Sequence, residues 1–390
     1  MTLDPVKTAI IGCGNISSIY LENATKWDIL DLRACANRTL PRAQSQAEKH
    51  HVPQAMPIAD VLADPEIELI INLTTPDAHA EIGLAALRAG KSVYNEKPLA
   101  ISREDGWLLL AEARDRGLRV GCAPDTFLGG GLQTCRQLID AGEIGTPVAA
   151  TGLMFIQGPE AWHPDPGFLY QVGAGPLFDI GPYYLTALIS LLGPIRRVTG
   201  SARITYPERI IGSGPKQGQT IPVETPTHIA AVLDFASGPV AMLVTSFDVA
   251  VSAGGALNLY DVGGALLEIQ GTTGTLSMPD PNTFGDPVRI RRLGETDWRE
   301  IPLTHAHTGN ERCLGVADLA HALCTGRPHR ANGELACHVL DAMHAVLEAS
   351  SSGQHMELST TCERPAPLPA GLPEYQLEEK RWPCKDWVAP

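Results

Sequence analysis

The stretch Val6-Lys-Thr-Ala-Ile-Ile-Gly12-Cys-Gly14-Asn-Ile-Ser17 decides the fold of the amino-terminal half. Its first six residues are mostly apolar and predict a buried β-strand, and the residues that follow predict a helix to about Ala24. The first glycine permits a tight turn, and the second lets the backbone approach a pyrophosphate resting on the amino end of the helix. Ser17 stands where a third glycine is common. This strand–turn–helix context predicts a dinucleotide-binding domain.

Further apolar runs alternate with helical stretches and extend this pattern. We expect strands at 30–36, 69–73, 91–94 and 118–122, and helices at about 41–50, 77–90 and 103–116. This alternation predicts an α/β Rossmann domain, a doubly wound parallel sheet, over residues 1–125. Pro124-Asp125 marks the crossing into a second domain.

The end of the second strand bears on the choice of cofactor. Position 37 follows Ser17 by 20 residues, where an acidic residue would bind the ribose 2′-hydroxyl of NAD. This chain has Asn37 and then Arg38. A carboxylate would repel a 2′-phosphate, whereas Arg38 could pair with one or stack on the adenine. The sequence therefore favours NAD(P) with a preference for NADP; the alternative is that Arg38 simply faces solvent.

Two further turns follow buried strands at the edge where open α/β sheets place their ligands. Thr74-Thr75-Pro76 follows the strand at 69–73, and Glu96-Lys97-Pro98 follows the strand at 91–94. Pro98 disfavours helical geometry at the preceding residue, which predicts an extended turn around Lys97. We interpret Lys97 as the proton-handling residue of a dehydrogenase, against the alternative of a solvated loop lysine.

Composition narrows the classes of function. The 390 residues carry a formal net charge of −14 and are 44% hydrophobic, which predicts a globular protein of two domains. The negative charge argues against nucleic acid and an anionic membrane surface as partners. The amino terminus has no secretory signal pattern. The nine scattered cysteines include no Cys-x-x-Cys, which favours reduced thiols in the cytoplasm over disulfides or zinc.

The sequence pattern changes after the dinucleotide-binding half. A helix is expected at Gly129–Ala141, and runs rich in β-branched residues then alternate with Gly/Pro turns. These runs predict antiparallel strands at 147–156, 196–205, 227–236, 239–248 and 256–269, with amphipathic helices at 311–324 and 334–349. We therefore expect a substrate-binding and oligomerisation domain over 126–360, followed by a proline-rich extended tail at 361–390 that could lie on a partner subunit.

The Gly-x-Gly-x-Ile-Ser turn, the Thr-Pro-x-x-x-His segment and Glu-Lys-Pro, at these separations, resemble the glucose–fructose oxidoreductase, inositol dehydrogenase and rhizopine catabolism (Gfo/Idh/MocA) family. The resemblance covers nearly the whole chain. It implies an α+β carboxyl-terminal domain with a mostly antiparallel open sheet, through which a homodimer or homotetramer would form. It also implies that Lys97 contacts the reacting hydroxyl and the nicotinamide. The cofactor-binding residues implied are Gly12, Gly14, Asn15, Ile16, Asn37, Arg38, Thr74, Thr75, Pro76, His79, Glu96 and Lys97.

The segment from Gly173 to Tyr184 resembles the family's Gly-Gly-x-x-x-Asp-x-Gly-x-His motif. Asp179 matches the family's aspartate, but Tyr183 stands at the position of its histidine. Four residues separate these positions, so we expect both side chains on one face of a helix that runs to Leu192. Tyrosine has a pKa near 10 and is a poorer base at neutral pH than histidine. Lys97 would then carry more of the acid–base work.

The stretch from Gln157 to Tyr170 precedes this motif and is rich in proline and aromatic residues. The rings of Trp162 and Tyr170 could stack on the C–H face of a sugar, and His163 could replace the missing histidine. The alternative is a loop packed by its own aromatic residues. The substrate-binding residues expected overall are Lys97, Asp125, Trp162, His163, Tyr170, Asp179 and Tyr183.

The hypothesis is hydride transfer between nicotinamide and a secondary hydroxyl or keto group of a sugar, inositol or related polyol. Lys97 would take or give the hydroxyl proton, Asp179 would orient it, and Tyr183 or His163 would relay the proton. One alternative is a redox-neutral epimerase, eliminase or glycoside-cleaving enzyme with retained NAD(P), and another is a catalytically impaired dinucleotide-binding regulator. The histidines at 305, 307, 338 and 344 lack partners at metal-ligand spacing, so no metal is expected.

Overall fold

The computed structural model describes residues 3–249, 265–278 and 280–378. The chain divides into two compact units. The first comprises Met1–Gly129, His305–Cys337 and Pro365–Pro390, and the second comprises Gly130–Thr304 and His338–Arg364. The division after Gly129 lies close to the expected boundary at 125, but the chain afterwards returns twice to the first unit. The sequence led us to expect three consecutive segments, 1–125, 126–360 and 361–390, and this division does not include the two returns to the first unit.

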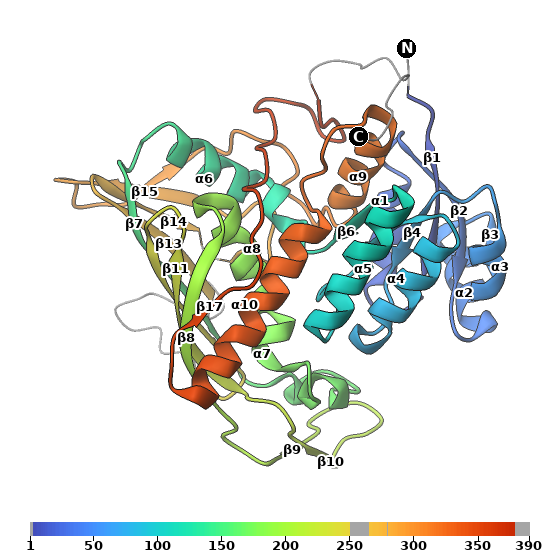
Figure 1. The fold of residues 1–390 in the computed structure, drawn as a ribbon, viewed down its shortest axis with the longest axis horizontal. Helices are drawn as coiled ribbons and strands as arrows, with labels where there is room; N and C mark the ends of the chain where they lie inside the picture. Colours follow the sequence, from blue (N-terminus) through green and yellow to red (C-terminus); the bar gives the residue numbers. More distant parts are fainter. Residues whose placement is uncertain (1–2, 250–264, 279, 379–390) are drawn as a thin grey trace. The chain divides into compact units, whose positions relative to one another are not determined.

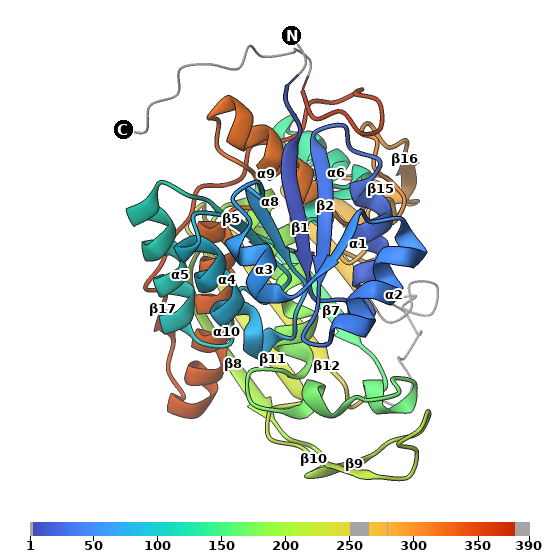
Figure 2. The same ribbon diagram turned by 90° about the vertical axis from the view of Figure 1, so that its right-hand side faces the viewer.

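The first unit contains a six-stranded parallel sheet in the order β3-β2-β1-β4-β5-β6. Figure 2 shows two of its strands, β1 and β2, side by side. The strands β4 and β5 are buried along their whole length, as parallel strands covered on both faces must be. The predicted doubly wound sheet is thereby confirmed. The strands are β1 (Val6–Ile11), β2 (Leu30–Ala36), β3 (Gln54–Met56), β4 (Leu69–Asn72), β5 (Ser92–Asn95) and β6 (Val120–Cys122).

Helices cover both faces of this sheet, because successive side chains along each strand point to opposite faces. Ala9 and Ile11 of β1 share a core cluster with side chains of α3, α4 and α5. On β5, the ring of Tyr94 lies against Gly315 of α9. The helices of this unit are α1 (Ser17–Ala24), α2 (Leu40–His50), α3 (Ile58–Ala63), η1 (Pro76–Ala78), α4 (His79–Arg88), α5 (Arg103–Arg116), η2 (Thr126–Leu128), α9 (Leu314–Thr325) and the start of α10 (Gly333–Ser352).

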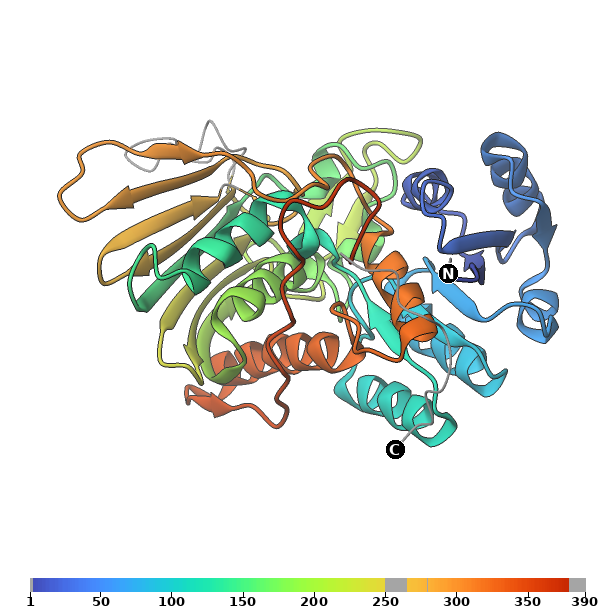
Figure 3. The same cartoon turned by 90° about the horizontal axis from the view of Figure 1, so that it is seen from above.

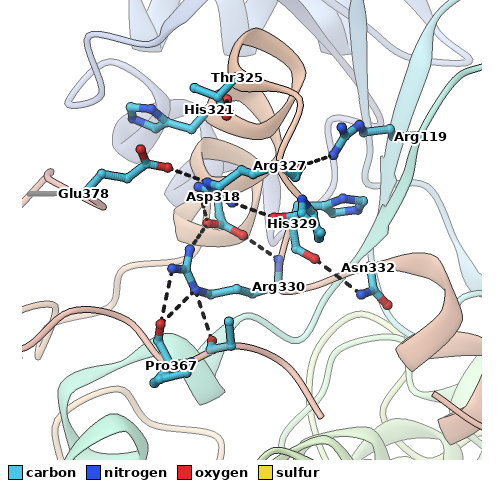
Figure 4. A network of polar contacts seen from close by, with 12 residues as sticks. Arg119, Asp318, His321, Thr325, Arg327, His329, Arg330, Asn332, Pro367 and Glu378 are labelled. Atoms are coloured by element: carbon cyan, nitrogen blue, oxygen red, sulfur yellow. Dashed lines mark hydrogen bonds and ion pairs between the residues drawn. The ribbon is translucent and has the colours of Figure 1, made fainter. Parts of the chain in front are cut away.

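The carboxyl-terminal segment up to residue 378 packs on its own first unit (Figure 4). Asp318 is fully buried and forms ion pairs with Arg327 and Arg330. Arg330 Nη2 donates to Pro367 O over 3.2 Å, and Arg327 pairs with Glu378. The two arginines hold the pKa of Asp318 below its usual range despite burial. Residues 365–378 of the expected tail therefore pack on their own chain, and its contact with a partner subunit stays a prediction; positions 379–390 lie outside the described residues.

The second unit is built on a nine-stranded sheet in the order β16-β15-β14-β13-β7-β12-β11-β8-β17. The β7–β12 pair is parallel and the other pairs are antiparallel, which confirms the predicted mostly antiparallel sheet. The strands are β7 (Pro147–Phe155), β8 (Ile195–Arg203), β11 (His228–Phe235), β12 (Val240–Ser246), β13 (Ala265–Gly271), β14 (Gly274–Met278), β15 (Val288–Arg292), β16 (Arg299–Ile301) and β17 (Met356–Glu357). Of the run expected at 256–269, positions 256–264 lie outside the described residues.

Helices lie against one face of this sheet in Figures 1 and 3, among them α6 (Gly130–Asp140) and α8 (Gly181–Leu192). The short helix α7 (Gly175–Asp179) precedes α8, and the hairpin β9 (Glu208–Ile210) and β10 (Thr220–Pro222) forms a separate small sheet. Two single-turn helices, η3 (Pro159–Ala161) and η4 (Gly167–Tyr170), shape the preceding loop. No helix among the described residues combines the length and apolar character needed to cross a bilayer.

Candidate active site

The turn after β1 has the geometry that its glycines predict. Gly12 has φ +109°, and a Cβ there would lie 2.5 Å from the carbonyl oxygen of Leu73, so a larger residue does not fit. Gly14 has no neighbouring atom within 4 Å of such a Cβ, so this side of the turn is open. Ser17 Oγ donates to Gly14 O over 2.7 Å and braces the turn. The turn therefore fits a dinucleotide phosphate at the start of α1.

Asn37, which follows β2, is bonded to this same turn. Cys13 N donates to Asn37 Oδ1 over 3.2 Å, so the amide at position 37 fixes the turn. Arg38 is exposed and has no hydrogen-bond or ion-pair partner among the described residues. Arg42 was missed by sequence reasoning. Its Nε donates to Cys13 O over 2.8 Å, which holds an exposed guanidinium beside the turn.

The Thr74–Pro76 turn is fixed by a buried amide and a buried imidazole. Asn72 Oδ1 accepts from Thr74 Oγ1 over 2.7 Å. His79 was expected to bind cofactor, but its ring is buried and its nitrogens face two carbonyls, Nε2 to Thr74 O at 3.1 Å and Nδ1 to Pro98 O at 2.6 Å. Burial lowers the pKa of His79. The imidazole therefore joins two turns and does not present an edge to a ligand.

Lys97 lies at the third strand end, directly after β5, and its side chain is half-buried. Glu96 is buried; its Oε1 accepts from Tyr20 Oη of α1 over 2.9 Å, and its Oε2 accepts from Lys97 N over 2.8 Å. The Lys97–Pro98 peptide bond is cis. The positive charge of Lys97 also contributes to lowering the pKa of His79. Glu96, expected at the cofactor, thus links the lysine turn to α1.

Asp125 was expected to contact substrate, and the structure corrects this expectation. The side chain is fully buried, and Asp125 Oδ2 accepts from Cys313 N over 3.0 Å and from Gly315 N over 2.9 Å. It therefore caps the start of α9. Burial raises the pKa of Asp125 to about 6, although the N–H of Gly315 favours the charged form.

A buried ionic network holds the loop at 157–170 in the second unit, which we call the aromatic loop. Tyr170 donates its hydroxyl hydrogen to Glu160, and Glu160 Oε1 pairs with Arg209 Nη1 at 2.9 Å. Arg209 also pairs with Asp248, and its guanidinium lies over the ring of Tyr170. Tyr170 is 0% exposed, so its expected stacking on substrate is corrected to a structural role. Sequence reasoning missed Glu160 and Arg209, because the pairing spans 49 residues.

Other aromatic residues of this loop are accessible. Trp162 is 64% exposed, and its ring meets that of His163 edge-on at 5.6 Å between centroids. His163 meets Phe168 in the same way, and its Nδ1 accepts from Asp165 N over 3.1 Å. An open pocket of about 230 Å³ lies beside this loop, lined by Asp165, Gly167, Gln171, Ile211, Lys216, Gln219, Thr220, Ile221, Pro222 and Glu224.

Asp179 and Tyr183 lie on consecutive helices rather than on one. Asp179 ends α7, and α8 begins at Gly181 after Ile180. Tyr183 N donates to Ile180 O over 3.0 Å, so the regular i to i+4 spacing is interrupted between the two residues. This break corrects the expected single helix. Asp179 is half-buried, whereas Tyr183 is buried.

Two of the histidines considered as metal ligands, His305 and His338, have other hydrogen-bond partners. His338 Nε2 accepts from Ile195 N over 3.0 Å, and its Nδ1 lies 2.9 Å from Thr360 Oγ1. His305 Nε2 lies 3.0 Å from Leu368 O. Within the described ranges, no group of three or more His, Cys, Asp or Glu residues could hold a metal ion.

The structure thus brings together three turns in the first unit, those at Gly12, Thr74 and Lys97. Gly12 lies against Leu73 and Thr74, and the His79 ring lies between the Thr74 and Pro98 carbonyls and can donate to one of them when neutral. Within the second unit, the rings of Trp162, His163 and Phe168 form one group. The arrangement in the first unit can hold a dinucleotide phosphate and place an ammonium group at the adjacent strand end.

Three sequence relatives are named as oxidoreductases, reductases or dehydrogenases. An uncharacterised oxidoreductase of Schizosaccharomyces pombe is 27% identical over 57% of this chain and 64% of its own length. A 1,5-anhydro-D-fructose reductase of Ensifer adhaerens is 30% identical over 33% of this chain and 40% of its own length. A scyllo-inositol 2-dehydrogenase (NADP(+)) of Bacillus subtilis is 24% identical over 51% and 55%. The matches thus span less than two thirds of each of these relatives.

Solved structures share the fold over nearly the whole chain. An NAD-binding oxidoreductase from Klebsiella pneumoniae has a TM-score of 0.77 at 22% identity, covering 92% of this chain and 100% of that one. The apo form of levoglucosan dehydrogenase has a TM-score of 0.78 at 18% identity, with the same coverage.

Two family models match consecutive parts of the sequence. Residues 6–123 match the oxidoreductase family model with an NAD-binding Rossmann fold. Residues 132–277 match the GFO/IDH/MocA carboxyl-terminal domain. The chain therefore belongs to the Gfo/Idh/MocA family of oxidoreductases.

Proposed function

We propose that this protein is an NAD(P)-dependent oxidoreductase acting on a secondary alcohol or ketone of a sugar, inositol or related polyol. The observation that carries the proposal is the grouping of an open glycine turn, the Thr74 turn and half-buried Lys97 at adjoining strand ends of one parallel sheet. The relatives named as anhydrofructose reductase and scyllo-inositol dehydrogenase support this class of substrate.

The nicotinamide supplies the hydride acceptor or donor when the cofactor is bound. In the oxidative direction, Lys97 in its neutral amine form takes the proton of the substrate hydroxyl and becomes an ammonium, as the C–H hydrogen leaves with its electron pair. In the reductive direction, Lys97 returns this proton to the oxygen. We assign orientation of the substrate to Asp179 and proton relay to Tyr183, with His163 as the other candidate for relay.

Within this proposal, the cofactor preference is for NADP. Position 37 is an asparagine already bonded to the glycine turn, so no carboxylate stands there to repel a 2′-phosphate. Arg38 is exposed with no partner among the described residues, and Arg42 is held beside the turn by Cys13 O. An exposed guanidinium group at either position would suit a phosphate dianion.

The aromatic loop is proposed to bind substrate. Trp162 and Phe168 are exposed large apolar side chains, and such rings bind the C–H faces of sugars. The neighbouring pocket is lined mainly by carboxylate, amide, hydroxyl and ammonium groups that can hydrogen-bond to hydroxyls.

A homodimer or homotetramer is proposed to form through the large sheet. Val148, Val232, Val240 and Met242 are exposed on strands β7, β11 and β12, which are neighbours in that sheet. Exposed apolar side chains on adjacent strands mark a surface suited to association. Light scattering during size-exclusion chromatography would measure the mass of the assembly.

The test of function is a spectrophotometric screen of sugars, inositols and related polyols against both NAD and NADP, with Lys97→Met as the matched variant. Turnover should fall by about 10²–10⁴-fold in this variant, because the positioned proton acceptor is removed. Cofactor titration should show binding close to that of the wild type. Turnover that survives Lys97→Met would overturn the assignment of Lys97.

A further inference from the structure

Two asparagines form a buried pair at the carboxyl ends of β4 and β5. Asn72 and Asn95 are register partners in the parallel sheet, and both side chains are 0% exposed. Asn72 Nδ2 donates to Asn95 Oδ1 over 3.0 Å. Burying a primary amide costs free energy unless its polar atoms are bonded. The other hydrogen bonds of these two residues therefore show which parts of the backbone the pair fixes.

The bonds of Asn95 fix the turn that carries Lys97. Asn95 Nδ2 donates to Leu99 O over 3.2 Å, two residues beyond the lysine. On the other side, Glu96 N donates to Asn72 O over 2.8 Å. The backbone is thus anchored at Glu96, just before Lys97, and at Leu99, two residues after it.

The His79 ring lies between this turn and the next one, and Asn72 Oδ1 accepts from Thr74 Oγ1 of that next turn over 2.7 Å. His79 Nδ1 lies 2.6 Å from Pro98 O, and its Nε2 lies 3.1 Å from Thr74 O. Asn72 Nδ2 donates to His79 O over 3.1 Å, which fixes the start of α4 as well. One connected network therefore sets the relative positions of the Lys97 turn and the Thr74 turn.

We propose that Asn95 is a positioning residue for Lys97, acting together with Asn72 through the backbone of residues 96–99. This inference rests on the proposed function, in which Lys97 handles the substrate proton. Displacement of a reacting group by about 1 Å can cost about 100-fold in rate. An asparagine suits position 95 because one amide accepts from Asn72 and donates to Leu99 O at the same time. Aspartate would only accept when ionised, and an apolar residue would do neither.

The first test compares Asn95→Leu with Asn23→Leu as a matched control. Asn23 is also 0% exposed in the first unit, and its Nδ2 donates to Asn310 O and Arg312 O over 2.7 and 2.8 Å. We expect kcat of Asn95→Leu to fall by about 10- to 100-fold, with the cofactor dissociation constant within about threefold of wild type. Asn23→Leu should lower the melting temperature comparably and leave kcat within about threefold.

The double variant Asn72→Leu/Asn95→Leu separates positioning from stability. Replacing both partners of a buried hydrogen bond with apolar groups of similar shape can be nearly neutral for stability. We expect its melting temperature to exceed that of Asn95→Leu, while kcat stays low. Recovery of kcat together with stability, or an equal loss of kcat in Asn23→Leu, would overturn the positioning role.

A second measurement does not depend on turnover. Acetic anhydride would label the folded protein, and peptide mass spectrometry would compare acetylation of Lys97 with that of exposed Lys49. The ratio of the two rates should rise at least about threefold in Asn95→Leu, because the released turn exposes the ammonium group. An unchanged ratio would overturn the inference. Absence of turnover by the wild type on every substrate would overturn the proposed function but leave this ratio interpretable.

Discussion

Replacing Gly12 with alanine tests the glycine turn most directly. The new Cβ would lie 2.4 Å from Leu73 C, 2.5 Å from Leu73 O and 2.7 Å from Thr74 N, and these are backbone atoms that cannot rotate away. The φ of +109° adds a conformational cost of about 1–2 kcal/mol for a residue with a Cβ. Overpacking typically costs about 1–3 kcal/mol. We therefore expect the free energy of unfolding to fall by about 2–5 kcal/mol.

Gly14→Ala is the matched control in the same turn. A Cβ at Gly14 meets no atom within 4 Å, so stability should stay within about 0.5 kcal/mol of wild type. Cofactor affinity should nevertheless fall in both variants, since the open side of the turn is where the phosphate is proposed to bind. Urea denaturation gives stability, and quenching of tryptophan fluorescence by NADP gives affinity. Normal cofactor binding by Gly14→Ala would refute this placement of the phosphate.

Three further predictions concern charge and buried polar groups. Asp125 has a folded pKa of about 6, above the value of about 3.9 for an unfolded chain, so its contribution to stability is greatest below pH 4 and falls as pH rises to about 6. The difference in unfolding free energy between wild type and Asp125→Asn should therefore change by about 2–3 kcal/mol between pH 4 and pH 7, favouring the wild type at low pH. Urea denaturation at several pH values would measure this difference, and a difference that does not change with pH would contradict the prediction. Tyr170→Phe leaves buried Glu160 without a hydroxyl donor, so the free energy of unfolding measured in urea should fall by about 1–3 kcal/mol. Tyr206→Phe, at an exposed ring, is the control and should lower it by less than about 0.5 kcal/mol. Arg38→Ala should weaken NADP binding by about 10-fold or more and change NAD binding by less than about threefold in fluorescence titrations; equal losses for both cofactors would argue against recognition of the 2′-phosphate.

The parallel sheet could be predicted because its signals are local. The helix expected at 103–116 is α5 residue for residue, since Ser102 accepts from Asp105 N at its start and Gly117 ends it with φ +65°. Short elements were missed for the opposite reason. β3 has three residues, and it forms only by pairing with β2, which periodicity cannot reveal.

The roles of site residues were less predictable than the strands that carry them. Asp125 and Tyr170 are polar residues near loops, where sequence alone favours a ligand contact. Their partners, Gly315 and Glu160, lie 190 and 10 residues away along the chain and turn both side chains inward. The Asp179–Tyr183 spacing implied one helix, but the break at Ile180 divides it. Each error arose where a tertiary contact or a local break decided the direction of a side chain.

Buried polar side chains alone do not mark the edge of the first sheet where we propose catalysis. Lys91, just before β5, is also buried, and its Nζ donates to Ile67 O over 2.9 Å and to Asp64 O over 2.5 Å. That lysine joins two loops at the amino end of the strand and has no ligand-binding turn to hold. Asn72 and Asn95, at the carboxyl end, bond instead to the turns of Thr74 and Lys97. The distinguishing feature is therefore which backbone segment a buried polar group fixes, and on this criterion the network around Lys97 fits the catalytic role that we propose for this turn.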